Sequence, residues 1–339
     1  MKALVVRLSS IGDVVHTLPC LDALHRAGHS AGWLAEAPSR DLLAGHPLLT
    51  CRVEPPRSRA FRFGPARDAV AALRREHFDI ALDFQGLWKS AAWARLSGAR
   101  RVRGYAGRFR REPASACLIG ERFDQPDDAV HVIDKNLALL RGIGIDAVGS
   151  REFSLPTTSS AAERVARGLS ELRVERFALL NPAGGWKSKL WPPECYGRLA
   201  RGLQERGVAS VVSWGPGEQA LAGEVVDASG GVARLSFPTT LSEFAELARR
   251  AALIVAADTG PLHIACAVGA PAVGLYGPTD PARNGPFSVE DEVVRRAPPC
   301  APCHKRSCAV HANIMSQIPG DEVLAAAERR LGRGMPHAV

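Results

Sequence analysis

Hydrophobic runs alternate with amphipathic segments along the whole chain. Runs rich in Val, Leu, Ile and Ala are typical of buried strands, and they read KALVVRL, AGWLAE and FDIALDF in the first half, then FALLNP, ASVVSWG, VARLSF, ALIVAAD and PAVGLYG. Between them, helix-like segments are expected at residues 14–26, 66–75, 87–96, 128–140, 193–206, 218–228 and 241–250, and after Thr259. Strands that alternate with helices predict parallel βαβ units.

A polar segment rich in Pro, Ser and Thr, from Leu155 to Ala161, separates the two series. A chain of 339 residues exceeds one ordinary core and fits two domains of roughly 150 residues. We therefore predict an α/β protein with two Rossmann-like, doubly wound parallel-sheet domains. Their expected bounds are residues 1–155 and 176–339, joined by a linker at 156–175, and the second domain ends in a C-terminal helix.

The composition is that of a globular protein, with 46% hydrophobic and 23% charged residues. The longest apolar run, Ala251 to Ala257, is far shorter than the ~20 residues that span a bilayer, and the first residues are too polar for a signal peptide. A cytoplasmic location is expected. Five cysteines lie among apolar neighbours and are expected to be reduced and buried, namely Cys20, Cys51, Cys117, Cys195 and Cys266.

Positive charge is concentrated in one stretch of the sequence. The chain carries a net charge of +8, yet residues 52–111 alone hold 15 Lys and Arg against 5 Asp and Glu, a net charge of +10. Almost all of these cations are arginine, whose planar fork suits phosphate and carboxylate. An anionic substrate or membrane surface fits this patch, and a solvated Arg-rich surface is the alternative. Because no zinc finger or RNP-type aromatic strand is present, the sequence disfavours nucleic acid.

Neither predicted domain carries a nucleotide fingerprint of the common kinds. The GxGxxG motif with an acidic residue about 20 positions later is missing, and so is GxxxxGK[ST]. Dinucleotide-dependent dehydrogenases and P-loop enzymes are therefore disfavoured.

The segment DTGPLH, starting at Asp258, predicts an anion site in the second domain. Asp258 ends the strand ALIVAAD, Thr259 and Gly260 form a turn, and Pro261 suits the first turn of a helix. The N-H groups and the dipole of that helix would face a diphosphate. His263 adds a donor in the same turn.

A second candidate lies in the loop NPAGGWKSKLWPPE. Gly184 and Gly185 would let backbone amides approach an anion closely, and Lys189 adds positive charge nearby. A glycine-rich loop with solvated lysines is the alternative. Glu218, at a later strand-to-helix turn, would accept hydroxyl groups of a ribose or sugar, or would cap the helix.

The first strand exit, RLSSIGDVVHTLP, holds a carboxylate, Asp13, where an open α/β domain often binds phosphate. An anion there would repel a phosphate. Two interpretations of Asp13 remain: a catalytic base, or the N-cap of a helix that starts near Val14.

A cluster of cysteines, PCAPCHKRSC, lies at residues 299–308. Cys300, Cys303 and Cys308 with His311 have a spacing that zinc would accept. Unpaired thiols or a labile disulfide are the favoured alternatives, so we expect no metal.

Six segments in order resemble the bacterial lipopolysaccharide heptosyltransferases, and most closely the heptosyltransferase I group. They are SSIGDVVHTLP, DFQGLWKSA, REPAS, GGWKSKLWP, DTGPLH and LYGPTDP. The resemblance implies GT-B architecture, with two Rossmann-like domains facing a cleft, and inverting transfer without metal or cofactor. It also implies ADP-heptose as donor, held by the C-terminal domain. The implied acceptor is Kdo-lipid A, held by the N-terminal domain at the cytoplasmic face of the inner membrane.

The resemblance also assigns roles to residues. Asp13 matches the proposed base of the family. The donor site would comprise Gly184, Gly185, Lys189, Glu218, Asp258, Thr259, Gly260 and His263. For the acceptor we expect contacts from Ser9, Ser10, Gly12, Arg57, Arg59, Lys89 and Arg111. Relatives often place a Thr-Thr pair where this chain has Gly184 and Gly185, so backbone N-H groups would have to replace the two hydroxyls.

Two other functions remain open at this point. Heptosyltransferase II, or another GT-B transferase that acts on a different acceptor, is the second candidate. A catalytically silent sugar-nucleotide-binding protein on the same scaffold is the other alternative, and the presence of Asp13, Lys189 and His263 together argues against it.

Overall fold

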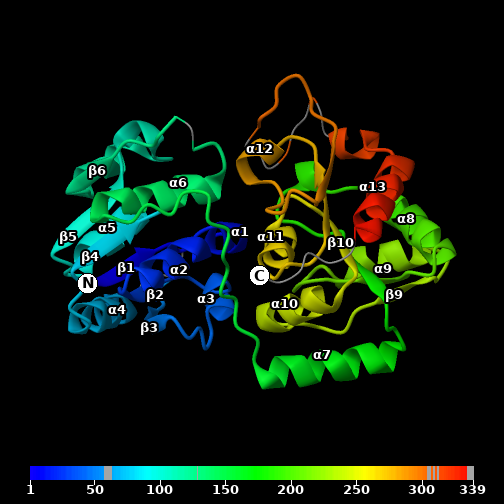
Figure 1. Cartoon of the computed structure of the whole chain (residues 1–339), viewed down its shortest axis with the longest axis horizontal. Coiled ribbons are helices and arrows are strands. Elements are labelled where there is room, and N and C mark those ends of the chain that lie inside the picture. Colours follow the sequence, from blue (N-terminus) through cyan, green and yellow to red (C-terminus); the bar gives the residue numbers. More distant parts are fainter. Residues whose placement is uncertain (57–62, 128, 304–306, 308–309, 311–312, 334–339) are drawn as a thin grey trace. The chain divides into compact units, whose positions relative to one another are not determined.

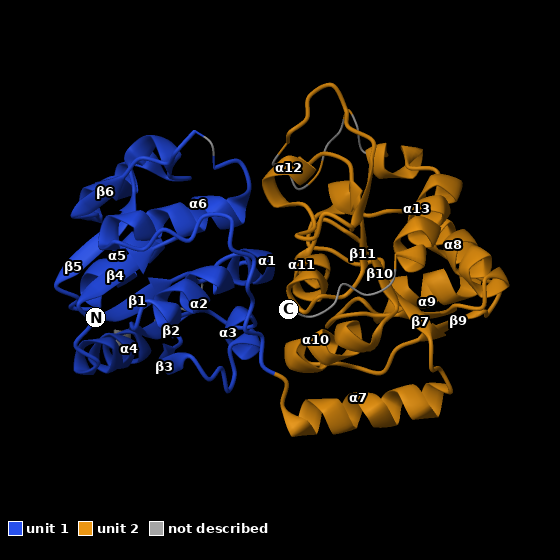
Figure 2. Ribbon diagram, viewed as in Figure 1, with its two compact units in different colours: residues 1–156 blue, residues 157–339 orange. Residues whose placement is uncertain are grey.

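The computed structural model describes the chain except residues 57–62, 128, 304–306, 308–309, 311–312 and 334–339. It divides into two compact units, Met1–Pro156 and Thr157–Val339 (Figure 2). Most of the range expected as a linker, 156–175, is a helix of the second unit, α7 (Ser159–Leu172). This helix was missed because it directly follows the Pro/Thr/Ser segment, whose composition is typical of a linker. Thr158 caps α7, since its side chain accepts a hydrogen bond from the Ala161 amide.

The first unit is built on a six-stranded parallel sheet with the order β3-β2-β1-β4-β5-β6 (Figure 1). The strands are β1 (Lys2–Val6), β2 (Ser30–Leu34), β3 (Leu49–Val53), β4 (Ile80–Asp83), β5 (Arg101–Tyr105) and β6 (Glu121–Phe123). The chain moves outward from β1 in one direction to β3, then returns to pair β4 with the other side of β1. In sheets of this kind, the point of reversal places a site at the carboxyl ends of the central strands.

The helices of this unit are mostly short. They are α1 (Ile11–Val15), α2 (Leu18–Arg26), α3 (Ser39–Leu42), α4 (Phe63–Arg75), α5 (Trp88–Leu96) and α6 (Val132–Ala138), with 3₁₀ turns η2 (Gly107–Phe109), η3 (Pro113–Leu118) and η4 (Leu139–Ile143). The single helix expected at 14–26 is in fact α1 and α2. Pro19 explains the break, because it lacks an N-H and its ring would clash with the carbonyl of Val15 in a continuous helix.

The second unit repeats the arrangement with the strand order β12-β11-β10-β7-β8-β9. Its strands are β7 (Phe177–Asn181), β8 (Ala209–Val212), β9 (Ala233–Leu235), β10 (Leu253–Ala257), β11 (Ala272–Tyr276) and β12 (Glu292–Arg295). The central strands β7, β10 and β11 are buried along their whole length, which explains their nearly continuous apolar sequences.

Helices cover both faces of this second sheet. Besides α7 they are α8 (Pro193–Glu205), α9 (Gln219–Ala228), α10 (Leu241–Arg250), α11 (Gly260–Ala267), α12 (Pro281–Asn284) and α13 (Gly320–Gly332), with 3₁₀ turns η5 (Lys187–Lys189) and η6 (Ile314–Gln317). The C-terminal helix α13 is held by Arg330, whose Nε lies 2.9 Å from Asp291 Oδ1 at a buried position. The predicted architecture of two tandem doubly wound parallel sheets is thus confirmed.

The cysteines differ in part from the expectation. Cys20, Cys195 and Cys266 are buried, but Cys51 is half-buried and Cys117 is exposed. Cys117 lies in η3, a surface turn rather than a core element. Among the residues described, no helix is both long and apolar enough to cross a membrane.

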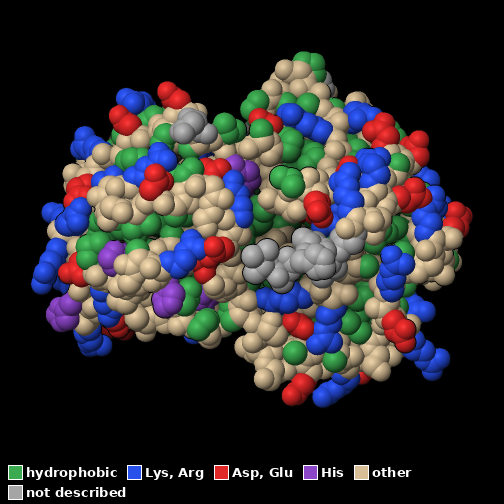
Figure 3. Space-filling model, in the orientation of Figure 1, with side chains coloured by type: hydrophobic (Ala, Val, Ile, Leu, Met, Phe, Trp, Pro, Cys, Tyr) green, Lys and Arg blue, Asp and Glu red, His purple; other side chains and the backbone are tan. Residues whose placement is uncertain are grey.

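The basic stretch, residues 52–111, carries less unpaired positive charge than its sequence suggests. Several of its cations pair with acids contributed by other segments, such as Arg101 with Glu121 at 2.5 Å and Arg108 with Asp124 at 2.9 Å. Arg110 is buried and pairs with Asp83 at 2.6 Å. On the face drawn in Figure 3, Lys and Arg side chains are interspersed with Asp and Glu. A linear count of charges could not anticipate these pairs.

Candidate active site

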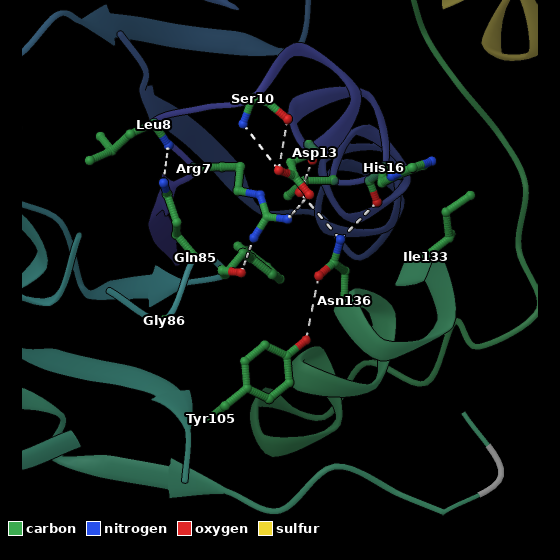
Figure 4. A network of polar contacts seen from close by, with 12 residues as sticks. Arg7, Leu8, Ser10, Asp13, His16, Gln85, Gly86, Tyr105, Ile133 and Asn136 are labelled. Carbon is green, nitrogen blue, oxygen red and sulfur yellow. Dashed lines mark hydrogen bonds and ion pairs between the residues drawn. The ribbon is translucent and has the colours of Figure 1, made fainter. Parts of the chain in front are cut away.

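Asp13 lies in the first turn of α1, directly after the exit of β1 (Figure 4). The helix begins at Ile11 with Ser10 as its N-cap, so the expectation of a helix that starts near Val14 and is capped by Asp13 is wrong. Asp13 instead reaches back to the cap. Its Oδ2 accepts hydrogen bonds from the Ser10 amide at 3.1 Å and from Ser10 Oγ at 2.9 Å.

Arg7 holds the other oxygen of this carboxylate. Arg7 Nη2 donates to Asp13 Oδ1 at 2.8 Å, and its Nη1 donates to the carbonyl of Phe84 at the exit of β4. Arg7 is buried, whereas the Asp13 side chain remains 39% exposed. The buried Arg7 therefore orients the carboxylate from the protein side, and the rest of the carboxylate contacts solvent. Sequence reasoning missed Arg7, although an arginine at the end of an apolar strand was the available signal.

Three strand ends converge around this carboxylate. The Leu8 amide donates to Gln85 Oε1 at 2.6 Å, which ties the exit of β1 to that of β4. The Glu36 amide donates to the Leu8 carbonyl at 3.0 Å, which brings in the exit of β2. Lys89 Nζ then lies 3.0 Å from both carboxylate oxygens of Glu36. Lys89, predicted to contact an acceptor, is thus positioned by Glu36, a residue that sequence reasoning did not identify.

The other residues predicted for the acceptor differ in their settings. Ser9 is half-buried, Gly12 is buried within α1, and Arg111 is exposed next to the buried Arg110. Arg57 and Arg59 lie outside the described residues. Ser9, Ser10, Gly12 and Lys89 therefore share one edge of the sheet with Asp13.

In the second unit, Asp258 is the centre of a buried polar cluster at the exit of β10. Lys189 Nζ lies 2.6 Å from Asp258 Oδ2 and donates to the Asp258 carbonyl at 3.1 Å. His263 Nε2 lies 3.1 Å from Oδ1. Burial alone would raise the pKa of Asp258, but the hydrogen bond and charge of His263, together with Lys189, hold that pKa well below its usual range.

A third donor to the same carboxylate was not predicted. Asn284 Nδ2, from α12, donates to Asp258 Oδ1 at 2.5 Å. The ring of His263 also stacks on Phe287, with 6.4 Å between the centroids. Both residues follow the GPTDP segment, whose turn brings them back to the helix start, and nothing in their local sequence marks them.

Lys189 is held from a second side as well. Its ammonium lies 4.5 Å from the centre of the Trp186 ring, and its side chain is 14% exposed. The Lys189 ammonium, in the glycine-containing loop, is therefore held between an aromatic ring and a carboxylate.

Gly184 lies against the N-cap of α11. A Cβ at Gly184 would be 2.7 Å from Thr259 Cγ2, closer than packed atoms allow, whereas a Cβ at Gly185 would meet nothing within 4 Å. Thr259 is the N-cap residue of α11, and Gly260 opens the helix. The glycine loop therefore packs directly on the helix end whose N-H groups and dipole suit an anion.

Glu218 lies at the N-cap position of α9, but its side chain bonds to the preceding turn. Its Oε2 accepts a hydrogen bond from the Gly215 amide at 2.9 Å, and no side-chain bond caps the helix.

In the cysteine cluster, Cys308 and His311 lie outside the described residues, while Cys300 is exposed and Cys303 half-buried. Over the part of the chain that is described, no group of three or more His, Cys, Asp or Glu is arranged to hold a metal ion.

Known proteins share both the sequence pattern and the fold. Lipopolysaccharide heptosyltransferase 1 of Pseudomonas aeruginosa is 29% identical over 328 residues, which covers 91% of this chain and 87% of that protein. The structure of Escherichia coli heptosyltransferase WaaC with ADP superposes with a TM-score of 0.75 at 25% identity, covering 97% of this chain and 100% of that one. The structure of E. coli ADP-heptose lps heptosyltransferase II gives a TM-score of 0.77 at 20% identity, covering 98% and 99%.

These matches identify the two sheets as a GT-B architecture. The sequence model of glycosyltransferase family 9 (heptosyltransferase) matches residues 67–313, well over half of the chain. The chain belongs to glycosyltransferase family 9, the heptosyltransferases.

Proposed function

We propose that the protein transfers L-glycero-D-manno-heptose from ADP-heptose to a Kdo residue of lipid A-linked lipopolysaccharide inner core, with inversion and without a metal or cofactor. The observation that carries the proposal is the cluster of Lys189, Asp258 and His263 at the start of α11. The relative solved with ADP, and the P. aeruginosa relative named heptosyltransferase 1, support the donor and the activity.

The second unit supplies the donor side in this proposal. The N-H groups at the start of α11 and the amides of Gly184 and Gly185 bind the diphosphate, and Lys189 contributes positive charge to it. Asp258 orients Lys189 and His263 through its two oxygens. Glu218, whose carboxylate already accepts the Gly215 amide, keeps a second oxygen for hydroxyl groups of the donor.

The first unit supplies the base. The acceptor hydroxyl oxygen attacks the anomeric carbon of the heptose on the face opposite the diphosphate. As that bond forms, the hydroxyl proton passes to the Asp13 carboxylate. The anomeric carbon–oxygen bond to ADP breaks, and its electron pair leaves with the diphosphate, where Lys189 stabilises the developing charge. Arg7 and Ser10 hold Asp13 in place for this step.

The acceptor assigned by this proposal is anionic, since Kdo carries a carboxylate and lipid A carries phosphates. Lys89 and the exposed Arg111 are cations near the exit of β4, and Arg57 and Arg59 add charge in the sequence. We assign the enzyme to the cytoplasmic face of the inner membrane as a peripheral protein. Reversing the charge of Arg111 together with Arg57 is expected to raise the acceptor KM and weaken binding to anionic vesicles, while ADP affinity stays constant.

A donor-by-acceptor panel tests the function. The purified protein is incubated with ADP-heptose and either Kdo-lipid A or heptosyl-Kdo-lipid A, and the glycolipid is weighed by mass spectrometry. A gain of one heptose on Kdo-lipid A alone supports the proposal. A gain only on the heptosylated acceptor would instead assign the role of heptosyltransferase II, to which the structure is also similar. ADP-heptose binding without turnover on any acceptor would indicate a silent binding protein.

A further inference from the structure

Trp88 differs from the other tryptophans of the chain. Its side chain is 46% exposed, although Trp33 and Trp191 are buried and Trp93, Trp186 and Trp214 are partly buried. A large indole surface in contact with water costs free energy that burial would recover. Binding a ligand that covers the Trp88 indole would therefore be favourable.

The backbone around Trp88 is fixed in place. The Trp88 amide donates to Glu112 Oε2 at 2.6 Å, and the Glu112 amide donates to the Gly86 carbonyl at 3.2 Å. These reciprocal hydrogen bonds join the loop after β4 to the loop after β5. The backbone that carries the indole is thus held by hydrogen bonds between two loops.

This position belongs to the same sheet edge as Asp13. Gln85, three residues before Trp88, accepts the Leu8 amide at the exit of β1. The next residue, Lys89, pairs with Glu36 at the exit of β2. Trp88 therefore begins α5 beside the strand ends that position the proposed base.

We propose that the indole of Trp88 is a stacking platform for a pyranose ring of the acceptor glycolipid. The inference rests on the proposed function and adds to it a named binding contact. The apolar C-H face of a sugar ring packs on the electron-rich face of an aromatic ring, and its hydroxyl and carboxylate groups need polar partners at the rim. Polar partners lie close to Trp88 in the fold and the sequence: Lys89 is the next residue, Glu112 accepts the Trp88 amide, and Arg111 precedes Glu112.

The charged rim argues for a sugar over a lipid chain. An acyl chain would have to desolvate Lys89 and Glu112 without hydrogen-bonding them, which is costly. A sugar ring satisfies both requirements, because it is apolar on one face and polar around its edge. Trp88 is therefore a specificity residue of the acceptor site and takes no part in proton transfer.

The test compares Trp88→Ala, Trp88→Phe and Trp88→Leu on two acceptors, Kdo-lipid A in micelles and a Kdo disaccharide without lipid. In Trp88→Ala we expect acceptor KM to rise about tenfold on both acceptors, which is ~1.4 kcal/mol, with donor KM and ADP affinity unchanged. Phe keeps a flat aromatic face and should stay near wild type. Leu keeps apolar bulk without that face and should behave like Ala.

Two outcomes would overturn the proposal. An effect restricted to the lipid-bearing acceptor would show that the indole contacts the lipid or the micelle. Leu behaving like Phe would show that apolar bulk is sufficient. Leu96→Ala is the matched control, because Leu96 is 44% exposed at the other end of α5 and should leave acceptor KM unchanged.

A binding arm separates this inference from the proposed function. If the wild-type enzyme transfers heptose to neither acceptor, the function is wrong while Trp88 remains testable. Calorimetric titration with the Kdo disaccharide then decides: weaker binding by Trp88→Ala but not by Leu96→Ala supports the platform, and equal or undetectable binding in wild type and variant overturns it.

Discussion

Lys189 Nζ and Asp258 Oδ2 lie 2.6 Å apart, although the two residues are 69 positions apart in the sequence. The carboxylate is buried, and the ammonium is largely shielded by the ring of Trp186. The ion pair thus joins the glycine loop after β7 to the helix start after β10. Together with the packing of Gly184 on Thr259, this contact joins the two segments of the proposed donor site.

Removing the Lys189 charge is expected to impair donor binding and transfer together. Lys189→Met keeps the aliphatic stem but cannot stabilise the diphosphate, so we expect ADP affinity to fall about tenfold and kcat by roughly 10². Calorimetry with ADP and steady-state kinetics measure the two effects. Lys187→Met is the control, because Lys187 is exposed in the same 3₁₀ turn. An effect confined to acceptor KM would contradict the assignment.

The two glycines of the loop are expected to respond differently to substitution. Gly184→Ala places a methyl group 2.7 Å from Thr259 Cγ2 and should displace the helix start, so ADP affinity falls about fivefold or more. Gly185→Ala meets nothing within 4 Å and should bind ADP as wild type does.

A double variant checks the steric cause. Thr259→Ser removes the Cγ2 that the new methyl group would meet, so Gly184→Ala with Thr259→Ser should bind ADP more tightly than Gly184→Ala alone. Simple additivity of the two single effects would show that the loss has another origin.

Asp13→Asn is expected to abolish most of the activity. Asparagine cannot take the acceptor proton, so kcat should fall by roughly 10² to 10⁴, while ADP affinity is unchanged. Because Arg7 is buried and loses its ionic partner, the free energy of unfolding should also fall, by about 1–2 kcal/mol. Full activity in this variant would contradict the assignment of Asp13 as the base and would leave it a structural role alone.

Ser10→Ala separates catalysis from helix capping. It removes the hydroxyl bond to Asp13 Oδ2 but keeps the carboxylate and its pairing with Arg7. We expect a loss of about 1 kcal/mol in unfolding free energy with a much smaller fall in kcat than for Asp13→Asn. Equal losses of kcat in the two variants would show that orientation, rather than basicity, limits the reaction.

His46 is expected to make the stability of the protein depend on pH. This side chain is buried and its Nδ1 accepts the Leu48 amide at 3.3 Å, and burial lowers its pKa to about 4. The unfolded chain, with a pKa of ~6.5, binds the proton more readily. The stabilisation is therefore complete above about pH 7 and is lost as the pH falls toward 4, by about 1–2 kcal/mol at pH 5.

Urea unfolding at pH 7 and pH 5 measures this effect. His46→Asn keeps an acceptor for Leu48 but does not titrate, so its unfolding free energy should change less between the two pH values than that of wild type. His25→Asn, at an exposed position of α2, should retain the wild-type difference. Equal pH dependence in all three proteins would exclude His46 as the cause.

The central strands were predictable because burial leaves a continuous apolar signature. β7, β10 and β11 are buried throughout, and their sequences showed it. Of the edge strands, β9 was predicted in the run VARLSF, whereas β3, β6 and β12 were not. β3 alternates between half-buried and exposed positions, and β6 has only three residues, Glu121–Phe123. Such short or polar strands are defined by their partner strand, which the local sequence does not show.

The candidate site was predictable where chemistry is local and unpredictable where it depends on partners. The DTGPLH turn placed Asp258 and His263 together because they are five residues apart on a strand exit and a helix turn. Glu36 and Asn284 were missed, since each acts on a residue brought to it by the fold. Contacts between residues far apart in the chain have no signature in one sequence. Arg7 is only six residues from Asp13, and its place at the end of an apolar strand was a signal that was overlooked.

The direction of β1 has a practical consequence for attaching the protein to a surface. The strand runs from Lys2 to Val6, and Asp13 follows its far end, so Met1 emerges at the opposite edge of the sheet, about 16 Å of strand away from the turn. Met1 is exposed there. A tether or fluorophore joined at Met1 would therefore hold the molecule by the end of β1 remote from Asp13 and leave the Asp13 end of this strand unmodified, as single-molecule or surface-binding measurements require.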